Sequence, residues 1–468
     1  MIFDLNKTPI NETNYDICVI GSGPAAFASI NEIKNKKIII LEAGGKEIDS
    51  LSQEQYEGDI KEDDYYDLTT CRLRCLGGTS GLWGGWCKPL DNFDFKKRTY
   101  VKDSGWPIER NSLSKYFNES CNLLEIENDF NKTRINDKNF LETRYQFSKV
   151  RYGEKKKKFL ENSKNVHCYL NANLYNAIIE NSKIKKLIIK NYKKENFFVK
   201  AKIFVFAMGG IENSRLTKWI IEKNSINSTI PIGNYWMEHP NLSLGHIVLN
   251  KDNNLISINR KQKRFFFSLT DEYKIKNRLL NGNIVITTKL NENSNLYKKI
   301  VFELKCNTNI LPSNIQCINK LNFHGEQEPN YKSKITLSRK KKDYFGIPKS
   351  ELHWKKTKLD LESCQKTIEK FKDFITTSNI GSLRLKNWIF KDSNKFFKEP
   401  RGGNHHMGGT RMSTNLENGV VDENCRFHLL NNLFFAGSSI FPTSGEANPT
   451  FTITNLGLRL RDHIVKII

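Results

Sequence analysis

A glycine turn between two short apolar runs near the N-terminus most constrains the fold of this chain. Residues 16–20 (DICVI) and 37–41 (KIIIL) are rich in β-branched side chains, which favours strands, and the stretch between them begins GSGPAA. A strand, a glycine turn, a helix and a second strand form a βαβ unit that holds the pyrophosphate of a dinucleotide at the helix N-terminus. The pattern therefore predicts an α/β domain of the Rossmann type with a dinucleotide site.

Four residues of this unit have specific expected roles. Gly21 permits the tight turn, Gly23 lets the backbone approach the pyrophosphate, and Ala26 replaces a third glycine where the helix packs on the strand. Glu42 follows the second strand and is placed to accept a hydrogen bond from an adenosine ribose. Because FAD and NAD share the ADP half that these residues contact, the unit alone leaves both cofactors open.

Two segments near the C-terminus carry side chains suited to chemistry on an alcohol. Residues 403–412 (GNHHMGGTRM) contain two histidines that can accept a proton near neutral pH. Residues 433–450 (LFFAGSSIFPTSGEANPT) contain Asn448, whose amide can hold a hydroxyl group without competing for its proton. Residues 432–436 also predict a strand that ends at Gly437, and residues 448–460 predict a helix, so this region again presents a helix N-terminus to a cofactor.

Several segments, in the same order along the chain, resemble the glucose–methanol–choline (GMC) oxidoreductase family, especially its pyranose-oxidase-like and bacterial sugar-dehydrogenase-like members. Besides the two C-terminal segments they are residues 74–89 (RCLGGTSGLWGGWCKP), 104–108 (SGWPI), 203–216 (IFVFAMGGIENSRL), 233–240 (GNYWMEHP) and 325–337 (GEQEPNYKSKITL). The resemblance implies bound FAD and oxidation of a primary or secondary alcohol, often on a sugar, by hydride transfer to the flavin. A dehydrogenase is favoured over an oxidase.

The expected architecture has two closely joined domains. Residues 1–239 and 401–468 should form a discontinuous, Rossmann-like FAD-binding domain, and residues 240–400 an inserted α+β substrate domain. Alternating runs at residues 283–289 (NIVITTK) and 334–337 predict strands of an antiparallel sheet that roofs the flavin. In the segment 203–216, an apolar strand should turn into a helix that starts near Glu212 or Asn213.

The cofactor contacts follow from the βαβ unit and from the resemblance. Residues 74–86 hold five glycines and two tryptophans, which let backbone amides approach a planar ligand while the indoles exclude water. Some relatives attach the flavin covalently through a histidine two residues after the serine of this motif, but Leu82 stands there, so non-covalent FAD is predicted. The expected contacts are Gly21, Gly23, Ala26, Glu42, Gly77, Gly78, Thr79, Ser80, Trp83, Gly84, Ala207, Gly437, Asn448, Pro449 and Thr450.

The resemblance also assigns the catalytic groups. The base of relatives lies seven residues before the methionine of an Arg-Met pair, and this spacing from Met412 selects His405. Neighbouring residues of an extended segment point to opposite faces, so His405 and His406 should not both face the flavin, and His406 is the alternative base. Asn448 stands where many relatives have a second histidine, and it is expected to bind the substrate oxygen. Gly409 stands where the family more often has threonine, a departure from its pattern.

Charge and composition add weaker expectations. The 74 lysines and arginines against 51 acidic residues give a net charge of +23, which the codon bias of an AT-rich genome explains without function; attraction of anionic sugars is the alternative. No recognition element predicts nucleic-acid binding, and the ten cysteines lack zinc-site spacing, so no metal is expected. Without a signal peptide or a transmembrane stretch, the expected location is cytoplasmic.

Two other function classes stay open from the sequence. One is an NAD-dependent dehydrogenase, and the other is a basic carbohydrate-binding protein with a relic flavin fold. The electron acceptor of the oxidoreductase also stays open between oxygen, a quinone and a carrier. The particular alcohol depends on the side chains of the substrate domain, and a shared fold does not transfer specificity.

Overall fold

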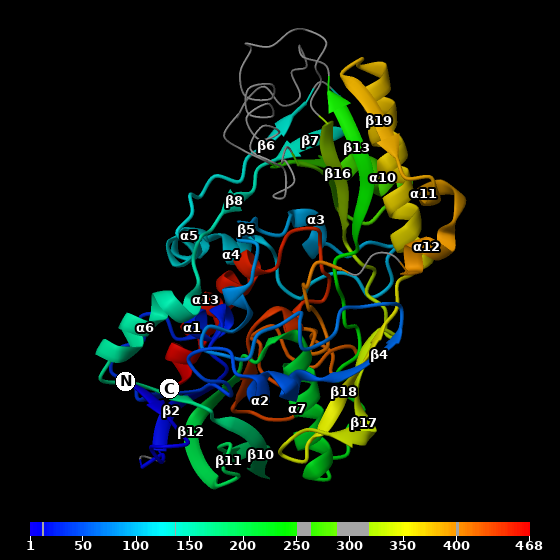
Figure 1. Cartoon of the computed structure of the whole chain (residues 1–468). Helices are drawn as coiled ribbons and strands as arrows, with labels where there is room; N and C mark the ends of the chain where they lie inside the picture. Colours follow the sequence, from blue (N-terminus) through cyan, green and yellow to red (C-terminus); the bar gives the residue numbers. More distant parts are fainter. Residues whose placement is uncertain (12–13, 136, 250–263, 288–317, 399–401) are drawn as a thin grey trace, which may run out of the picture.

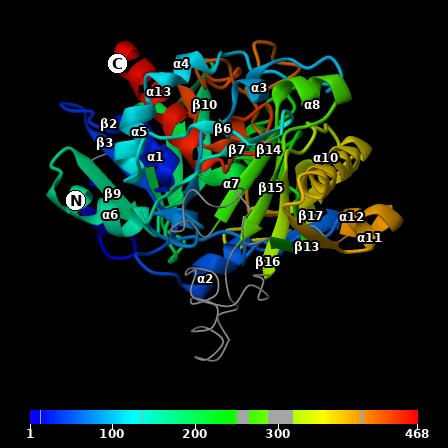
Figure 2. The same ribbon diagram turned by 90° about the horizontal axis from the view of Figure 1, so that it is seen from above.

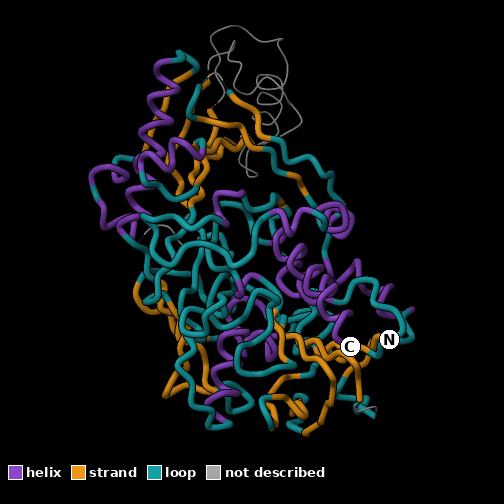
Figure 3. The backbone as a smooth tube through the Cα atoms, turned by 180° about the vertical axis from the view of Figure 1, so that it is seen from behind, coloured by secondary structure: helices purple, strands orange, loops and turns teal. Residues whose placement is uncertain are grey.

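The computed structural model describes residues 1–11, 14–135, 137–249, 264–287, 318–398 and 402–468. A mostly parallel sheet lies at one end of the molecule together with both marked chain ends, and an antiparallel sheet lies at the other end (Figure 1). Loops occupy most of the space between the two sheets, as the tube view shows (Figure 3). The predicted α/β fold class is confirmed.

The parallel sheet contains the predicted βαβ unit. Its strand order is β1 (Ile2–Asp4), β9 (Val166–Leu170), β3 (Ile38–Leu41), β2 (Asn14–Ile20), β12 (Asn196–Phe206), β11 (Lys183–Lys190) and β10 (Asn173–Glu180), with β20 (Leu433–Phe435) beside β12. Strands β1, β9, β3, β2, β12 and β20 pair in parallel, and β10 and β11 extend β12 as an antiparallel meander. Helix α1 (Pro24–Ser29) leads from β2 towards β3, as expected.

The C-terminal helix completes this layer. Helix α13 (Thr450–Ile467) packs against α1 so closely that a Cβ atom added to Gly457 would lie 2.6 Å from Cβ of Ala28. Helix α7 (Gly209–Lys223) follows β12, but it starts before the predicted position. The side chain of Asn213, the fifth residue of α7, accepts a hydrogen bond from Met208 N at 2.9 Å, rather than capping a helix that starts there.

The second sheet is antiparallel throughout and has the order β19 (Gly381–Leu385), β13 (Asn241–Leu249), β16 (Ile318–Gly325), β15 (Gly282–Thr287), β14 (Arg264–Leu269), β7 (Phe140–Thr143) and β6 (Lys132–Arg134). Helix α10 (Lys358–Thr377) covers one face, and apolar side chains of the helix and the strands form a common core (Figure 2). The strand expected at 283–289 is β15; residues 288 and 289 lie outside the described ranges.

Strand pairing crosses the predicted domain boundaries at two places. Strands β6 and β7 come from the first predicted domain but belong to the antiparallel sheet. Strands β17 (Lys334–Lys342) and β18 (Pro348–Trp354) come from the predicted substrate domain but form a three-stranded sheet with β4 (Gly58–Glu62). The boundaries at 240 and 400 stay a prediction, and the two parts of the chain exchange strands around them.

The remaining elements are short, apart from α6. The helices are α2 (Ser50–Gln53), α3 (Asn92–Phe95), α4 (Asn111–Ser114), α5 (Phe117–Leu124), α6 (Tyr152–Asn162), α8 (Asp271–Asn277), α11 (Trp388–Lys391) and α12 (Ser393–Lys398), with 3-10 turns at Glu54–Tyr56, Gly78–Gly81 and Ser438–Ile440, and a small ladder joins β5 (Trp86–Cys87) to β8 (Gln146–Phe147). Within the described residues, no helix combines the length and the apolar character that crossing a membrane requires.

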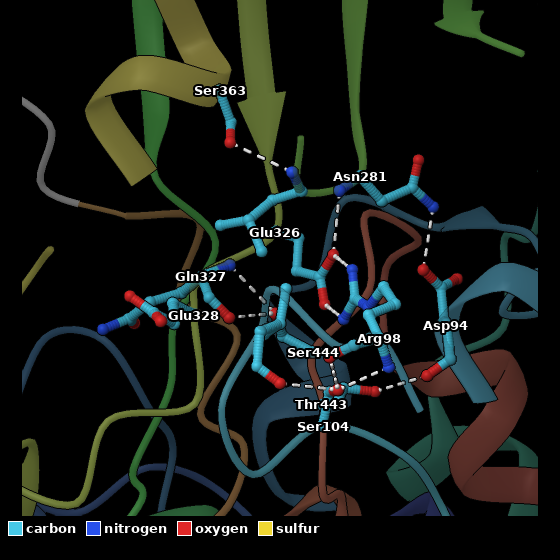
Figure 4. Close-up of polar contacts among 12 residues, drawn as sticks. Asp94, Arg98, Ser104, Asn281, Glu326, Gln327, Glu328, Ser363, Thr443 and Ser444 are labelled. Carbon is cyan, nitrogen blue, oxygen red and sulfur yellow. Dashed lines mark hydrogen bonds and ion pairs between the residues drawn. The ribbon is translucent and has the colours of Figure 1, made fainter. Parts of the chain in front are cut away.

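Buried polar contacts join the antiparallel sheet to the loops above the parallel sheet (Figure 4). Both terminal nitrogens of Arg98 donate to the carboxylate of Glu326, at 2.7 and 2.5 Å, and Asn281 N donates to the same carboxylate at 2.8 Å. The Asn281 amide also donates to Asp94 at 2.8 Å. Burial, together with the nearby carboxylates of Asp91 and Glu326, raises the pKa of Asp94 to about 7. These contacts fix the position of the antiparallel sheet relative to the loops above the parallel sheet.

Candidate active site

A cavity of about 350 Å³ lies at the carboxyl ends of β2 and β12, next to the starts of α1 and α13. Its wall combines segments far apart in sequence: the glycine turn, the motif at residues 78–85, and the C-terminal segments with His405 and Asn448. The expected cofactor residues in this wall are Gly21, Gly23, Glu42, Gly78, Thr79, Ser80, Trp83, Gly84, Ala207, Gly437, Asn448, Pro449 and Thr450. The structure therefore brings segments from the N-terminal and C-terminal parts of the chain together at one cavity.

Two of the expected cofactor residues lie behind the wall instead. Ala26 is fully buried in the core where α1 packs on the sheet. Gly77 has a positive φ of 86°, and a Cβ atom there would lie 2.1 Å from Gly153 N. Gly77 N donates to the Ser22 hydroxyl at 3.0 Å, which ties the motif at residues 78–85 to the glycine turn. These residues shape the wall rather than line it.

The glycine turn has room for a phosphate group. Gly23 precedes α1 without any side-chain cap on the helix, and a Cβ atom added to Gly23 would be 4.0 Å from its nearest neighbour, Gly77 O. Pro24 has no backbone N–H, and the next residue, Ala25, lines the cavity; its amide belongs to the first turn, where backbone N–H groups have no partner within the helix. At a helix N-terminus, such amides attract anions such as a pyrophosphate. The turn thus fits the dinucleotide that the sequence predicts.

Glu42 is held in place at the end of β3. Its carboxylate accepts hydrogen bonds from the Ser22 hydroxyl at 2.6 Å and from Gly44 N at 2.9 Å. Burial raises the pKa of Glu42, although these hydrogen bonds and the nearby Arg74 act in the opposite direction. Each carboxylate oxygen has a second lone pair, so Glu42 can still accept a hydrogen bond from a ribose hydroxyl.

Charged residues that the sequence analysis missed surround the same end of the cavity. The guanidinium groups of Arg72 and Arg74 lie 4.0 and 5.1 Å from the ring centroid of Tyr56. Arg72 and Arg215 both form buried ion pairs with Glu212, at 3.0 and 2.9 Å. The short spacing of two arginines just before the glycines of the motif could have suggested a basic wall. Glu212, the partner of Arg72, lies on α7 and has no local signal, and Arg74 instead donates to the side-chain oxygen of Asn173 at 2.7 Å.

An antiparallel bridge between Met237 and Met407 positions the histidine segment. In the register of this bridge, His405 lies opposite His239, and their Nδ1 atoms are 2.9 Å apart. The backbone N–H of His405 donates to both carboxylate oxygens of Glu238, each at 2.9 Å. Burial, with the neighbouring histidines His239, His324 and His406, lowers the pKa of His405 well below its usual value. His405 is therefore a neutral proton acceptor at physiological pH.

His406 points to a different neighbourhood, as the alternation of an extended segment predicts. Its Nε2 lies 2.9 Å from the hydroxyl of Tyr65, and its ring packs at 5.9 Å from that of Trp236. Burial, with the charge of Arg72, lowers the pKa of His406 to about 3. Both histidines contribute to the cavity wall, but the ring of His406 is engaged by aromatic neighbours and that of His405 by His239.

Asn448 stands immediately before the proline that precedes α13 and lines the cavity. Its amide nitrogen donates to the carbonyl oxygen of Trp86 at 2.9 Å, which fixes the orientation of the amide plane. The second N–H and the carbonyl oxygen remain available for a ligand. Among the described residues, no group of three or more histidine, cysteine or acidic side chains is arranged to hold a metal ion.

Sequence comparison agrees with this geometry. Residues 329–457 match the profile of the GMC oxidoreductase family. Over these residues the chain is similar to the GMC oxidoreductases. This confirms the resemblance that the motifs predicted, and the matched range includes His405 and Asn448.

Two curated relatives match over less than a third of this chain. A 2-methyl-1,2-propanediol dehydrogenase of Mycolicibacterium austroafricanum is 28% identical over 140 residues, which are 30% of this chain and 24% of that protein. The large subunit of a fructose dehydrogenase of Gluconobacter japonicus is 28% identical over 137 residues, 29% of this chain and 23% of that protein. The matches therefore span about a quarter of the length of either relative.

Solved structures show the same fold over nearly the whole chain. A pyridoxine 4-oxidase from Mesorbium loti has a TM-score of 0.60 at 14% identity and covers 96% of this chain and 98% of its own. A formate oxidase variant of Aspergillus oryzae, studied for modification of its FAD, has a TM-score of 0.62 at 14% identity and covers 98% and 99%. At this identity the likeness shows the fold alone.

Proposed function

We propose that this protein is an FAD-dependent oxidoreductase that oxidises a primary or secondary alcohol, with a sugar hydroxyl as the leading candidate. The observation that carries the proposal is the convergence of His405 and Asn448 on one cavity with the glycine turn. Alcohol oxidation with a dinucleotide cofactor requires a group that accepts the hydroxyl proton, a group that orients the substrate oxygen, and a site for the cofactor's phosphates. The imidazole of His405, the amide of Asn448 and the glycine turn can supply these three functions. The names of the diol dehydrogenase and the fructose dehydrogenase support an alcohol or a sugar as substrate.

His405 and Asn448 have complementary roles in the proposed mechanism. His405 accepts the proton of the substrate hydroxyl, and the free N–H of Asn448 donates to the substrate oxygen and so orients the carbon that is oxidised. When bound, FAD supplies the acceptor for the hydride that leaves this carbon. The alcohol thus loses one proton to His405 and one hydride to the cofactor, and it becomes an aldehyde or ketone. General-base catalysis is typically worth about 10²–10⁴-fold in rate.

FAD is proposed to bind along the cavity wall without a covalent bond. Glu42 would accept from the ribose, the backbone at Gly23 would face the pyrophosphate, and the residues from Gly78 to Gly84 would lie beside the flavin. The electron acceptor that returns the flavin to its oxidised form is proposed to be a quinone or a carrier rather than oxygen, because both curated relatives are dehydrogenases.

The test is anaerobic mixing of the purified yellow protein with a panel of sugars, sugar derivatives and simple alcohols. A compound that bleaches the flavin absorbance identifies the substrate class, and air admitted afterwards separates an oxidase from a dehydrogenase. The variant His405→Ala should keep FAD and slow flavin reduction by about 10²–10⁴-fold. His406→Gln is the matched control, because its ring contacts Tyr65, and it should change the rate by less than about tenfold.

Three outcomes would contradict the proposal. A protein without flavin absorbance that reduces NAD would support an NAD-dependent dehydrogenase. A yellow protein that no alcohol bleaches would support a binding protein with a relic fold. Undiminished flavin reduction in His405→Ala, together with a strong loss in His406→Gln, would transfer the role of base to His406.

A further inference from the structure

His239 stands between the proposed base and a backbone carbonyl group. Its Nδ1 lies 2.9 Å from Nδ1 of His405, and its Nε2 lies 3.3 Å from the carbonyl oxygen of Ser444. The side chain is buried, with 2% of its surface exposed, so water does not compete for either nitrogen. The two contacts together determine where the protons of both imidazoles lie.

The proton positions follow from the chemistry of the partners. A carbonyl oxygen only accepts hydrogen bonds, so Nε2 of His239 must carry a hydrogen. In a neutral imidazole the other nitrogen, Nδ1, then has a lone pair and accepts. The contact between the two Nδ1 atoms needs one donor, so Nδ1 of His405 carries the hydrogen. The remaining nitrogen of His405, Nε2, is left with a lone pair.

We propose that His239 is a positioning residue that fixes His405 in the tautomer whose Nε2 can accept the hydroxyl proton. The inference rests on the proposed function for its catalytic meaning, but the tautomer itself is a property of the folded protein. A hydrogen bond at one ring nitrogen of a histidine sets which nitrogen is free for chemistry at the other. His239 does this for His405 without touching the substrate.

The opposite assignment would disable the base. If His239 were a cation, both of its nitrogens would donate, and Nδ1 of His405 would have to accept. His405 Nε2 would then carry the hydrogen and could not take a proton from the alcohol. Burial lowers the pKa of His239, although the carbonyl of Ser444 and the carboxylates of Glu446 and Glu326 favour its charged form. The burial of the ring therefore agrees with a neutral His239, the state in which Nδ1 of His405 carries the hydrogen.

Surrounding polar contacts hold Ser444 and His405, the two hydrogen-bond partners of the His239 ring, in place. The backbone N–H of Gln327 donates to the Ser444 hydroxyl at 3.1 Å, which anchors the residue whose carbonyl accepts from His239 (Figure 4). The side-chain oxygen of Gln327 accepts from Glu238 N at 2.8 Å. Because Glu238 binds the backbone N–H of His405, the consecutive residues Glu238 and His239 hold the main chain and the ring of the base.

The neighbouring threonine anchors the same loop on the other side. Thr443 donates from its hydroxyl to Asp94 O at 2.7 Å and accepts from Trp106 Nε1 at 2.8 Å. Figure 4 shows Thr443 and Ser444 side by side, below the ion pair of Arg98 and Glu326. The contacts that join the antiparallel sheet to the loops above the parallel sheet thus also fix the Ser444 carbonyl group that accepts from His239.

The first test measures the tautomer directly in the FAD-bound protein. Ring-¹⁵N-labelled histidine would be incorporated, and the signals of His405 would be assigned by comparison with His405→Gln. We expect the resting protein to show a protonated Nδ1 and a non-protonated Nε2 at His405, and His239→Ala to lose this pattern. A protonated Nε2 at His405 in the unmodified protein would overturn the inference, whether or not any alcohol reduces the flavin.

The second test separates positioning from a purely structural role. His239→Ala should lower the limiting rate of flavin reduction by about 10–100-fold while the substrate dissociation constant stays within about threefold. His239→Asn places an amide oxygen near the position of Nδ1 and should recover most of the lost rate. Melting temperatures of both variants report any loss of stability. Equal rates in the alanine and asparagine variants, with FAD retained in both, would overturn the positioning role.

Discussion

Gly21 and Ala207 meet across the carboxyl ends of β2 and β12, and a Cβ atom on Gly21 would lie 2.4 Å from the carbonyl oxygen of Ala207. Gly21 also has a φ of 101°, which residues with a side chain rarely adopt. Two residues later, Gly23 has an ordinary backbone conformation and open space around the same position. The two glycines of one turn are therefore required for different reasons.

This difference gives a paired prediction. Gly21→Ala should destabilise the protein without any cofactor, by at least about 1–3 kcal/mol, because the new methyl group strains the backbone. Gly23→Ala should leave the melting temperature of the cofactor-free protein unchanged but weaken FAD binding by at least about tenfold, because its methyl group projects towards the proposed pyrophosphate. Thermal melting of the apoprotein and FAD titration separate the two effects. Normal FAD affinity in Gly23→Ala would show that the pyrophosphate lies elsewhere.

The pH dependence of flavin reduction should show a single rising limb below pH 6.5. Burial and the surrounding histidines lower the pKa of His405, so the neutral form that accepts a proton persists below the usual range of a histidine. Only at lower pH does protonation remove the base, and the rate should fall there and stay level above. Asn448 does not titrate, so it adds no second limb. Stopped-flow reduction at saturating substrate measures the profile, and a limb above pH 7 would exclude His405 as the titrating group.

The cofactor should dissociate when the protein is denatured. Leu82 occupies the position where some relatives have a histidine bonded to the flavin; it lines the cavity, and 61% of its surface is exposed. A leucine side chain has no atom that can form a bond to the flavin. Acid precipitation of the yellow protein should leave the FAD absorbance in the supernatant and a colourless pellet. A yellow pellet would require a covalent bond to another residue.

Removal of one partner of the ion pair between Arg98 and Glu326 should strongly destabilise the native state. Glu326→Gln leaves a buried guanidinium without its charge partner, which costs about 3–5 kcal/mol in comparable cases. The matched control is Glu362→Gln, which removes an exposed pair with Lys358 on α10 and should cost less than about 1 kcal/mol. Urea unfolding of the three proteins measures both values. Equal losses of unfolding free energy in the two variants would mean that other contacts compensate the charge of Arg98 when Glu326 is replaced.

Local signals predicted the parts of the fold that are contiguous in the chain. The strands and helix around Gly21 and Gly23 follow from β-branched runs and a glycine turn, and all of these lie within one stretch. The pairing of β18 with β4, and of β7 with β14, joins segments distant in sequence. No residue pattern in either segment specifies its partner, so the predicted boundaries could not include these exchanges.

The same distinction applies to the candidate site. His405 and Asn448 could be predicted because they stand in segments that resemble motifs of the GMC family. His239 lies in a segment that also resembles the family, but its contact with His405 depends on the register of the bridge between Met237 and Met407. The position of Arg72 in the cavity wall likewise depends on its ion pair with Glu212, which reaches it from α7. Such partners become visible only when the chain is folded.

The C-terminal segments supply one side of the cavity wall, and β20 and α13 take their places beside β12 and α1. A nascent chain emerges from the ribosome N-terminal end first, so the glycine turn and most of the parallel sheet are synthesised long before these segments. Until residues 403–453 arrive, the turn has no opposite wall to enclose a ligand. Loading of the proposed FAD is therefore expected to be a late event in biogenesis, and prematurely terminated chains should accumulate as colourless protein with an open glycine turn.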